Sequence, residues 1–181
     1  MNPVEIISRF YPDDTPLRRL LIRHSGQVRD KALELLEMSD LPADRDIVSG
    51  GAMLHDIGIG SCHAPGIFCT GTEPYILHGV IGARLLRGCG PQWEPFARIC
   101  ERHTGAGITA EEAAAQKLPL PPGDYLPETT EEKLICLADK FYSKSGDMRE
   151  KSLPDIRRSL AKFGPQTLER FDTLCRLAHL L

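Results

Sequence analysis

Apolar residues recur at intervals of three and four positions over most of the chain, which is the spacing of one face of an α-helix. The longest such pattern covers residues 17–35 and includes His24. It follows Thr15-Pro16, an N-cap residue with proline at the first helical position. A second pattern of the same kind predicts a helix at residues 41–55.

Sequence signals for strands are almost absent, and the remaining patterns also predict helices. Two capping boxes, Thr109-x-x-Glu112 and Thr129-x-x-Glu132, each place a hydroxyl and a carboxylate where they satisfy unpaired backbone donors of a first helical turn. Besides the helices after these boxes, helices are predicted at residues 72–87, 91–103, 154–163 and 165–181. We therefore predict an all-α fold, a single-domain bundle of about seven to nine helices. The predicted domain covers residues 1–181, with a core at 15–145 and C-terminal helices at 154–181.

Composition agrees with one globular domain. The chain has 181 residues, of which 41% are hydrophobic and 26% charged. Its formal net charge of −3 provides no overall basic field, so we expect no non-specific nucleic-acid binding. No run of about 18 apolar residues occurs, so we expect no membrane span. The N-terminus lacks the features of a secretory signal and the six cysteines form no CxxC motif, which predicts a cytoplasmic protein with reduced cysteines.

Ionisable residues occupy the apolar faces of several predicted helices. Four of the six histidines and two aspartates are placed in this way: His24, His55, Asp56, His78, His103 and Asp139. Apolar faces point to the core, where an ionisable group is costly unless it is paired or binds a cation. Imidazole and carboxylate are ligands that borderline divalent metals prefer, so converging helices would form a metal site in the core. The alternative is that each histidine is a hydrogen-bonded core residue without a ligand role.

The order of these residues resembles the HD-domain superfamily of metal-dependent phosphohydrolases, and His55-Asp56-Ile57-Gly58 matches its HDIG variant. The resemblance covers residues 15–145 and implies an all-α, HD-domain-like fold. The segment Glu101–Gly107 is also similar to that of small uncharacterised HDIG proteins of bacteria and archaea. Bis-nucleoside tetraphosphate hydrolases of the HD type share the same order of ligands.

The resemblance implies a centre of two divalent ions. His24, His55, Asp56 and Asp139 would hold one ion, and His78 and His103 would hold a second ion that Asp56 also contacts. Iron or manganese is favoured, and zinc, nickel, cobalt and magnesium are the alternatives. The implied enzyme hydrolyses a small phosphorylated metabolite, above all a nucleotide or dinucleotide polyphosphate, with a metal-activated hydroxide.

One departure from the family concerns a lysine. Many HD phosphohydrolases carry a lysine shortly after the His-Asp pair, whereas this chain continues with Ile57-Gly58-Ile59-Gly60-Ser61. Other cations are therefore candidates for binding substrate phosphate, namely Arg23, Arg102 and Lys140 beside the proposed ligands and Lys144 one helical turn further along. We predict Asp56 and Lys140 as the catalytic residues.

Two other functions use the same residues. HD-fold proteins with six such ligands include di-iron oxygenases, and the ligand types alone do not separate oxygenase from hydrolase because imidazole and carboxylate suit iron, manganese and zinc alike. The third reading is a non-catalytic nucleotide-binding domain with a structural metal. In each case we expect a small-molecule ligand and a monomer or homodimer.

Overall fold

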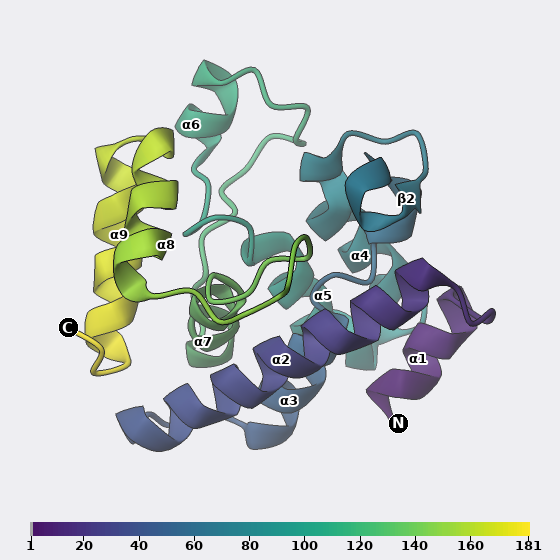
Figure 1. Ribbon diagram of the computed structural model, residues 1–181, viewed down its shortest axis with the longest axis horizontal. Helices are drawn as coiled ribbons and strands as arrows, with labels where there is room; N and C mark the ends of the chain where they lie inside the picture. The colour runs from purple at the N-terminus through teal and green to yellow at the C-terminus, as the bar shows by residue number, and fades with distance from the viewer. Residues whose placement is uncertain (1) are drawn as a thin grey trace.

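The computed structural model describes residues 2–181 and has one small two-stranded sheet among its helices (Figure 1). Within that range the α-helices are α1 (Pro3–Phe10), α2 (Pro16–Ser39), α3 (Arg45–Leu54), α4 (His78–Arg87), α5 (Glu94–Arg102), α6 (Ala110–Ala115), α7 (Thr130–Asp139), α8 (Leu153–Leu160) and α9 (Pro165–Leu177). The all-α prediction is therefore confirmed. Among residues 2–181, none of the helices is both long enough and apolar enough to cross a membrane.

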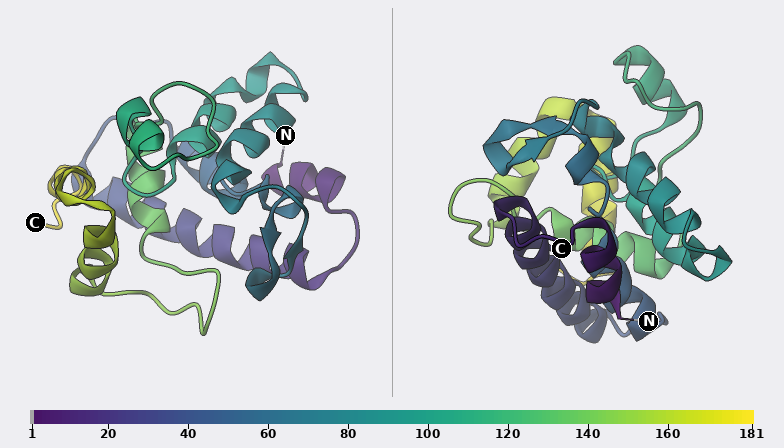
Figure 2. Two further views of the ribbon diagram at one scale, coloured as in Figure 1. Left: turned by 90° about the horizontal axis from the view of Figure 1, so that it is seen from above. Right: turned by 90° about the vertical axis from the view of Figure 1, so that its right-hand side faces the viewer.

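Helix α2 is the longest element, and it packs against α3 and α7 along one side of the molecule (Figure 1). It begins where the sequence predicts, because the Thr15 hydroxyl accepts a hydrogen bond from the backbone N–H of Arg18 at 3.1 Å. Its predicted apolar face is buried and includes Leu21, Val28 and Leu35. Helix α1 and the small sheet lie toward one end of this helix, and helices α8 and α9 lie toward the other (Figures 1 and 2).

Buried apolar side chains form two clusters. One joins α2, α3 and α7 to the C-terminal helices, and Phe171 of α9 is fully buried in it. The other joins α1, α4, α5 and the turn after α3, and includes Ile7 and Leu54. Helices α3 and α5 contribute to both clusters, so the segment after α3 is held between two packed regions.

Several element boundaries differ from the predictions. The helix predicted at residues 72–87 begins at His78, after a 3₁₀ turn at Tyr75–Leu77, and the helix predicted at 91–103 begins at Glu94, after a 3₁₀ turn at Pro91–Trp93. The helix predicted from residue 41 begins at Arg45, because the Asp44 side chain accepts hydrogen bonds from the N–H groups of Asp46 and Ile47. The last predicted helix, 165–181, ends at Leu177.

Several short elements have no counterpart in the predictions, among them the 3₁₀ turns at Ile59–Ser61 and Pro65–Ile67, helix α1 and the small sheet. Helix α1 covers only Pro3–Phe10 and is capped by Asn2, and a helix of this length depends on tertiary packing for its stability. The small antiparallel sheet pairs β1 (His63–Ala64) with β2 (Cys69–Thr70). Strands of two residues are too short to show an alternating pattern in the sequence.

The turn after α3 packs directly against α4 through a glycine. A Cβ atom built on Gly58 would lie 2.1 Å from the carbonyl oxygen of His78 and 2.4 Å from the backbone nitrogen of Gly82. A Cβ atom built on Gly82 would in turn lie 3.2 Å from the backbone nitrogen of Gly58, so there is little space for a side chain at either position. The glycine therefore permits the backbone contact that brings the residues around His55 and His78 together.

We expect a Gly58→Ala variant to be destabilised by about 3 kcal/mol, because the new methyl group meets backbone atoms that can move only with the whole turn. Urea denaturation measures this difference. The control is Gly26→Ala in α2, where a Cβ atom meets nothing within 4 Å. That variant should be stabilised by about 0.5–1 kcal/mol, because alanine favours the helix. Equal stability of the two variants would contradict the packing argument.

Candidate metal centre

The predicted ligands converge at the ends of helices. His24 is the exception, since it lies in the middle of α2. The others are His55 after the last residue of α3, Asp56 next to it, His78 as the first residue of α4, His103 after the last residue of α5, and Asp139 as the last residue of α7. All six side chains are buried, and none exposes more than 9% of its surface. Sequence positions up to 115 residues apart therefore form one cluster.

Four of these residues form a first group of ligand atoms. The Nε2 atom of His24 lies 3.0 Å from Oδ1 of Asp139 and 3.3 Å from Oδ2 of Asp56. The Nε2 atom of His55 lies 3.1 Å from the same Asp56 oxygen and 3.4 Å from the same Asp139 oxygen. One nitrogen or oxygen from each residue lies within 4.8 Å of the others, which is the arrangement required to hold a metal ion.

The second group shares Asp56 with the first. The Nε2 atoms of His78 and His103 each lie 3.5 Å from Oδ1 of Asp56 and 3.0 Å from one another. Oδ2 of Asp56 faces the first group while Oδ1 faces the second. The carboxylate of Asp56 therefore lies between the two groups and belongs to both.

Three histidines are oriented so that Nε2 points into the cluster. The Nδ1 atom of each makes a hydrogen bond with the backbone carbonyl oxygen of the residue three positions earlier. The partners are Ala52 for His55 at 2.7 Å, Tyr75 for His78 at 2.6 Å, and Cys100 for His103 at 2.8 Å. A carbonyl oxygen only accepts, so Nδ1 donates its proton and Nε2 presents a lone pair to the cluster in a neutral ring. Metal-binding histidines are oriented in this way.

The cluster contains buried polar atoms that make no hydrogen bond. They include Nε2 of His55 and Oδ1 of Asp56, whereas Oδ2 of Asp56 has the ammonium group of Lys144 at 2.7 Å. Such atoms are costly in a protein interior unless a cation or a donor reaches them. Because these atoms are nitrogen and oxygen donors that face one another, the residues fit a divalent metal ion.

The carboxylates dominate the electrostatics of the first group. Burial would lower the pKa of His55, but Asp56 and Asp139 outweigh it and raise the pKa to about 9. Burial would raise the pKa of both aspartates, but nearby positive charges outweigh it. His55 and Lys144 hold the pKa of Asp56 well below its usual range. Lys140 and Lys144 do the same for Asp139. In the second group, burial and the neighbouring His103 lower the pKa of His78 to about 3.

We expect metal binding at pH 7 to release about one proton from His55, because a ring with a pKa near 9 is protonated before the ion binds. Metal affinity should therefore rise with pH until the pKa of about 9 is reached. Calorimetric titrations in two buffers with different ionisation enthalpies measure the released proton. Identical heats in the two buffers would contradict this prediction.

The predicted cations differ in their positions. The Nζ atom of Lys144 lies 2.7 Å from Oδ2 of Asp56, and that of Lys140 lies 2.8 Å from Oδ2 of Asp139. Lys140 also donates a hydrogen bond to the carbonyl oxygen of His103 at 3.1 Å, so it links two ligand positions. Arg102 points elsewhere, since it binds the carbonyl oxygen of Leu126. Arg23 is exposed and lines a separate cavity beside Lys144.

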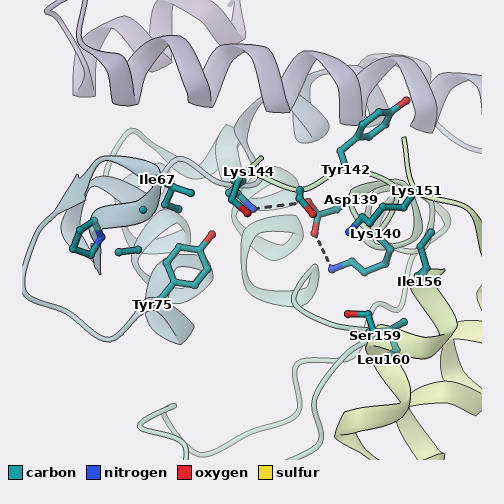
Figure 3. Close-up of a pocket in the computed structure, with 15 residues that line it drawn as sticks. Ile67, Tyr75, Asp139, Lys140, Tyr142, Lys144, Lys151, Ile156, Ser159 and Leu160 are labelled. Atoms are coloured by element: carbon teal, nitrogen blue, oxygen red, sulfur yellow. Dashed lines mark ion pairs between the residues drawn. The ribbon is translucent and has the colours of Figure 1, made fainter. Parts of the chain in front are cut away.

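A cavity of about 470 Å³ opens beside the cluster at Asp139 (Figure 3). Lys140 and Lys144 line it next to that carboxylate, and both form ion pairs with it. Tyr75 and Ile67 lie on one side of the cavity, and residues of α8 lie on the other (Figure 3). The volume suits a small-molecule ligand. The buried ligand cluster is therefore reached from a cavity with basic side chains.

Comparison with known proteins agrees with the resemblance in the sequence. The HD domain family matches residues 21–143. The chain is 42% identical over 136 residues to a tRNA (cytidine(56)-2′-O)-methyltransferase of Picrophilus torridus and 38% identical over 151 residues to the protein of the same name of Thermoplasma volcanium. It is also 42% identical over 124 residues to an uncharacterised protein of Methanocaldococcus jannaschii. No solved structure matches the chain.

The matched relatives are longer than the matched region. The alignments cover 75%, 78% and 67% of this chain, in the order Picrophilus, Thermoplasma and Methanocaldococcus. They cover 35%, 40% and 65% of the respective relatives. The chain therefore spans between about one third and two thirds of the length of the curated relatives that it matches.

Proposed function

We propose that this chain, which belongs to the HD-domain family, is a metal-dependent phosphohydrolase with a centre of two divalent ions. The proposal rests on the family membership and on the geometry of the ligand cluster. The observation that carries the proposal is the pair of buried ligand groups that share Asp56 and adjoin a cavity with lysine side chains. Substrates are small phosphorylated molecules, with nucleotides and dinucleotide polyphosphates as the leading class.

The two groups of donor atoms indicate which residues would hold the metal ions. His24, His55, Asp56 and Asp139 would hold one ion, and Asp56, His78 and His103 would hold the other. Imidazole and carboxylate ligands suit iron, manganese and zinc alike, so the preference for iron or manganese rests on the resemblance to HD-domain enzymes. When bound, divalent ions supply acidity to a coordinated water and neutralise the negative charge of a phosphoryl group.

The protein's own side chains bind and orient the substrate. Lys144 lies at the junction of Asp56 and the cavity, so its ammonium group is placed to bind a phosphoryl oxygen. This lysine supplies the cation that is missing after the His-Asp pair in the sequence. Lys140, the lysine predicted to be catalytic, pairs with Asp139 and the carbonyl of His103 and holds that carboxylate in position. It also lines the cavity, where it remains within reach of substrate.

Two relatives carry names that describe methyl transfer to tRNA. Methyl transfer is not part of the proposal, since the chain aligns with only 35% and 40% of these proteins. Their alignments cover three quarters or more of this chain and must overlap its HD domain. We infer that an HD domain is the part they share.

The test is phosphate release from a panel of nucleotides, dinucleoside polyphosphates and short RNAs with terminal phosphates, with Mn²⁺ or Fe²⁺ added. The proposal predicts release by the wild type that requires metal, and no release by Asp56→Ala. Equal release by both proteins would reveal a contaminant and contradict the proposal.

Oxygen consumption by the iron-loaded protein in place of phosphate release would instead favour the di-iron oxygenase. A ligand-induced melting shift without turnover would favour the non-catalytic binding domain.

A further inference from the structure

One wall of the cavity comes from a part of the chain outside the family match. The match ends at residue 143, whereas Lys151, Ile156, Ser159 and Leu160 also line the cavity (Figure 3). Ile156 and Leu160 are buried in the core cluster around α7 and α9, so α8 is anchored beside the metal centre. The cavity is therefore completed by a segment that lies outside the residues matched by the family.

The backbone fixes Lys151 at this wall. Its N–H group donates a hydrogen bond to the carbonyl oxygen of Phe141 at 2.8 Å, which ties the segment to the end of α7. The next residue, Ser152, caps α8 by accepting a hydrogen bond from the N–H of Asp155. The backbone of Lys151 is therefore fixed by hydrogen bonds on both sides, and its side chain extends into the cavity near Asp139 and Lys140 (Figure 3).

The charge of Lys151 is not balanced by a partner. Within residues 2–181, Lys140 and Lys144 form ion pairs with the carboxylates of the cluster, whereas Lys151 forms none. Burial lowers the pKa of Lys151, and the charges of Lys140 and Lys144 lower it further, while Asp139 opposes them. A partly buried cation beside two others is stabilised by an anion that enters the cavity.

We propose that Lys151 binds a second anionic group of the substrate, distinct from the phosphoryl group at the metal centre, and so selects molecules with two linked phosphates. This inference rests on the proposed function, because it places the first phosphate at the cluster of Asp56 and Asp139. The cavity of about 470 Å³ is large enough for a diphosphate and the group that carries it. Lys151 is thus a specificity-determining residue.

The test compares two ligands that cannot be hydrolysed, methylenediphosphonate and methylphosphonate, in calorimetric titrations of the Mn²⁺-loaded full chain. We expect the wild type to prefer methylenediphosphonate. Lys151→Met should weaken its binding about 30-fold and change methylphosphonate binding less than about threefold, because only the second anion loses a charged partner. Ser159→Glu, which adds a carboxylate to the same wall, should also weaken methylenediphosphonate binding. The matched control is Lys162→Met, an exposed lysine outside the cavity, which should behave as the wild type.

If Lys151→Met weakens the binding of both ligands equally, the inference is overturned, since the residue would then act on the metal centre as a whole. Unchanged methylenediphosphonate binding, or no preference in the wild type, would also overturn it. These readouts do not depend on turnover. A preference for the diphosphonate without phosphate release would leave the second anion site intact and contradict only the hydrolase.

Discussion

An Asp56→Asn variant is expected to lose most of its bound metal and to hydrolyse substrate about 1,000-fold more slowly than the wild type, a loss of roughly 4 kcal/mol in transition-state stabilisation. The reason is the position of the carboxylate. One oxygen lies 3.1 Å from Nε2 of His55 in the first group, and the other lies 3.5 Å from Nε2 of His78 in the second. Asparagine has the same shape but only one oxygen and no charge, so it impairs both groups at once.

The control for this variant is Asp30→Asn, because Asp30 lies exposed on α2 and, among residues 2–181, pairs only with its neighbour Arg29. Its metal content and rate should equal those of the wild type. Circular dichroism shows whether each variant is folded, and mass spectrometry of the metals measures their content. An Asp56→Asn protein that keeps both its metal and its rate would contradict the role of a shared ligand.

A Lys144→Met variant is expected to show two opposite changes. Hydrolysis should fall about 100-fold, because the substrate loses a cation that binds a developing negative charge. Metal affinity should rise about tenfold, because the ammonium group lies 2.7 Å from Oδ2 of Asp56 and competes with the ion for that oxygen. A purely structural role would not raise metal affinity while lowering the rate.

Lys144→Arg is the matched variant, since it retains the charge but changes the shape of the donor group. It should recover part of the rate and should not show the rise in metal affinity. Steady-state kinetics with excess Mn²⁺ and separate metal titrations measure the two effects. If Lys144→Met hydrolyses substrate at the wild-type rate, Lys140 becomes the leading candidate for the phosphate-binding cation.

The sequence predicts those parts of the fold that depend on local signals. Thr15 and Thr129 begin α2 and α7 at the expected positions, because their side chains cap the helices without help from distant residues. The sequence pattern predicts a helix from residue 41, whereas the Asp44 side chain caps α3 so that it begins at Arg45. Helix α1 has its own cap at Asn2, but its eight residues need the core around Ile7 to be stable.

The ligand cluster could be predicted, whereas the cavity beside it could not. Histidines and aspartates on the apolar faces of predicted helices indicate a buried polar site, since burial of such groups requires partners. The walls of the cavity depend on how the segment after α7 turns back over the cluster. That turn is fixed by long-range contacts, such as the hydrogen bond from Gln27 of α2 to the carbonyl oxygen of Met148 at 2.9 Å. Lys151 therefore has no signal in the sequence that links it to Asp139.

The metal content of the full chain tests the central claim most directly. Wild-type protein incubated with Mn²⁺ or Fe²⁺ and then desalted should retain about two ions per chain, one for each group that shares Asp56. His78→Ala should retain about one ion, because it removes a ligand from the second group alone. Wild-type protein that retains no metal, or a content unaffected by His78→Ala, would contradict a centre of two ions.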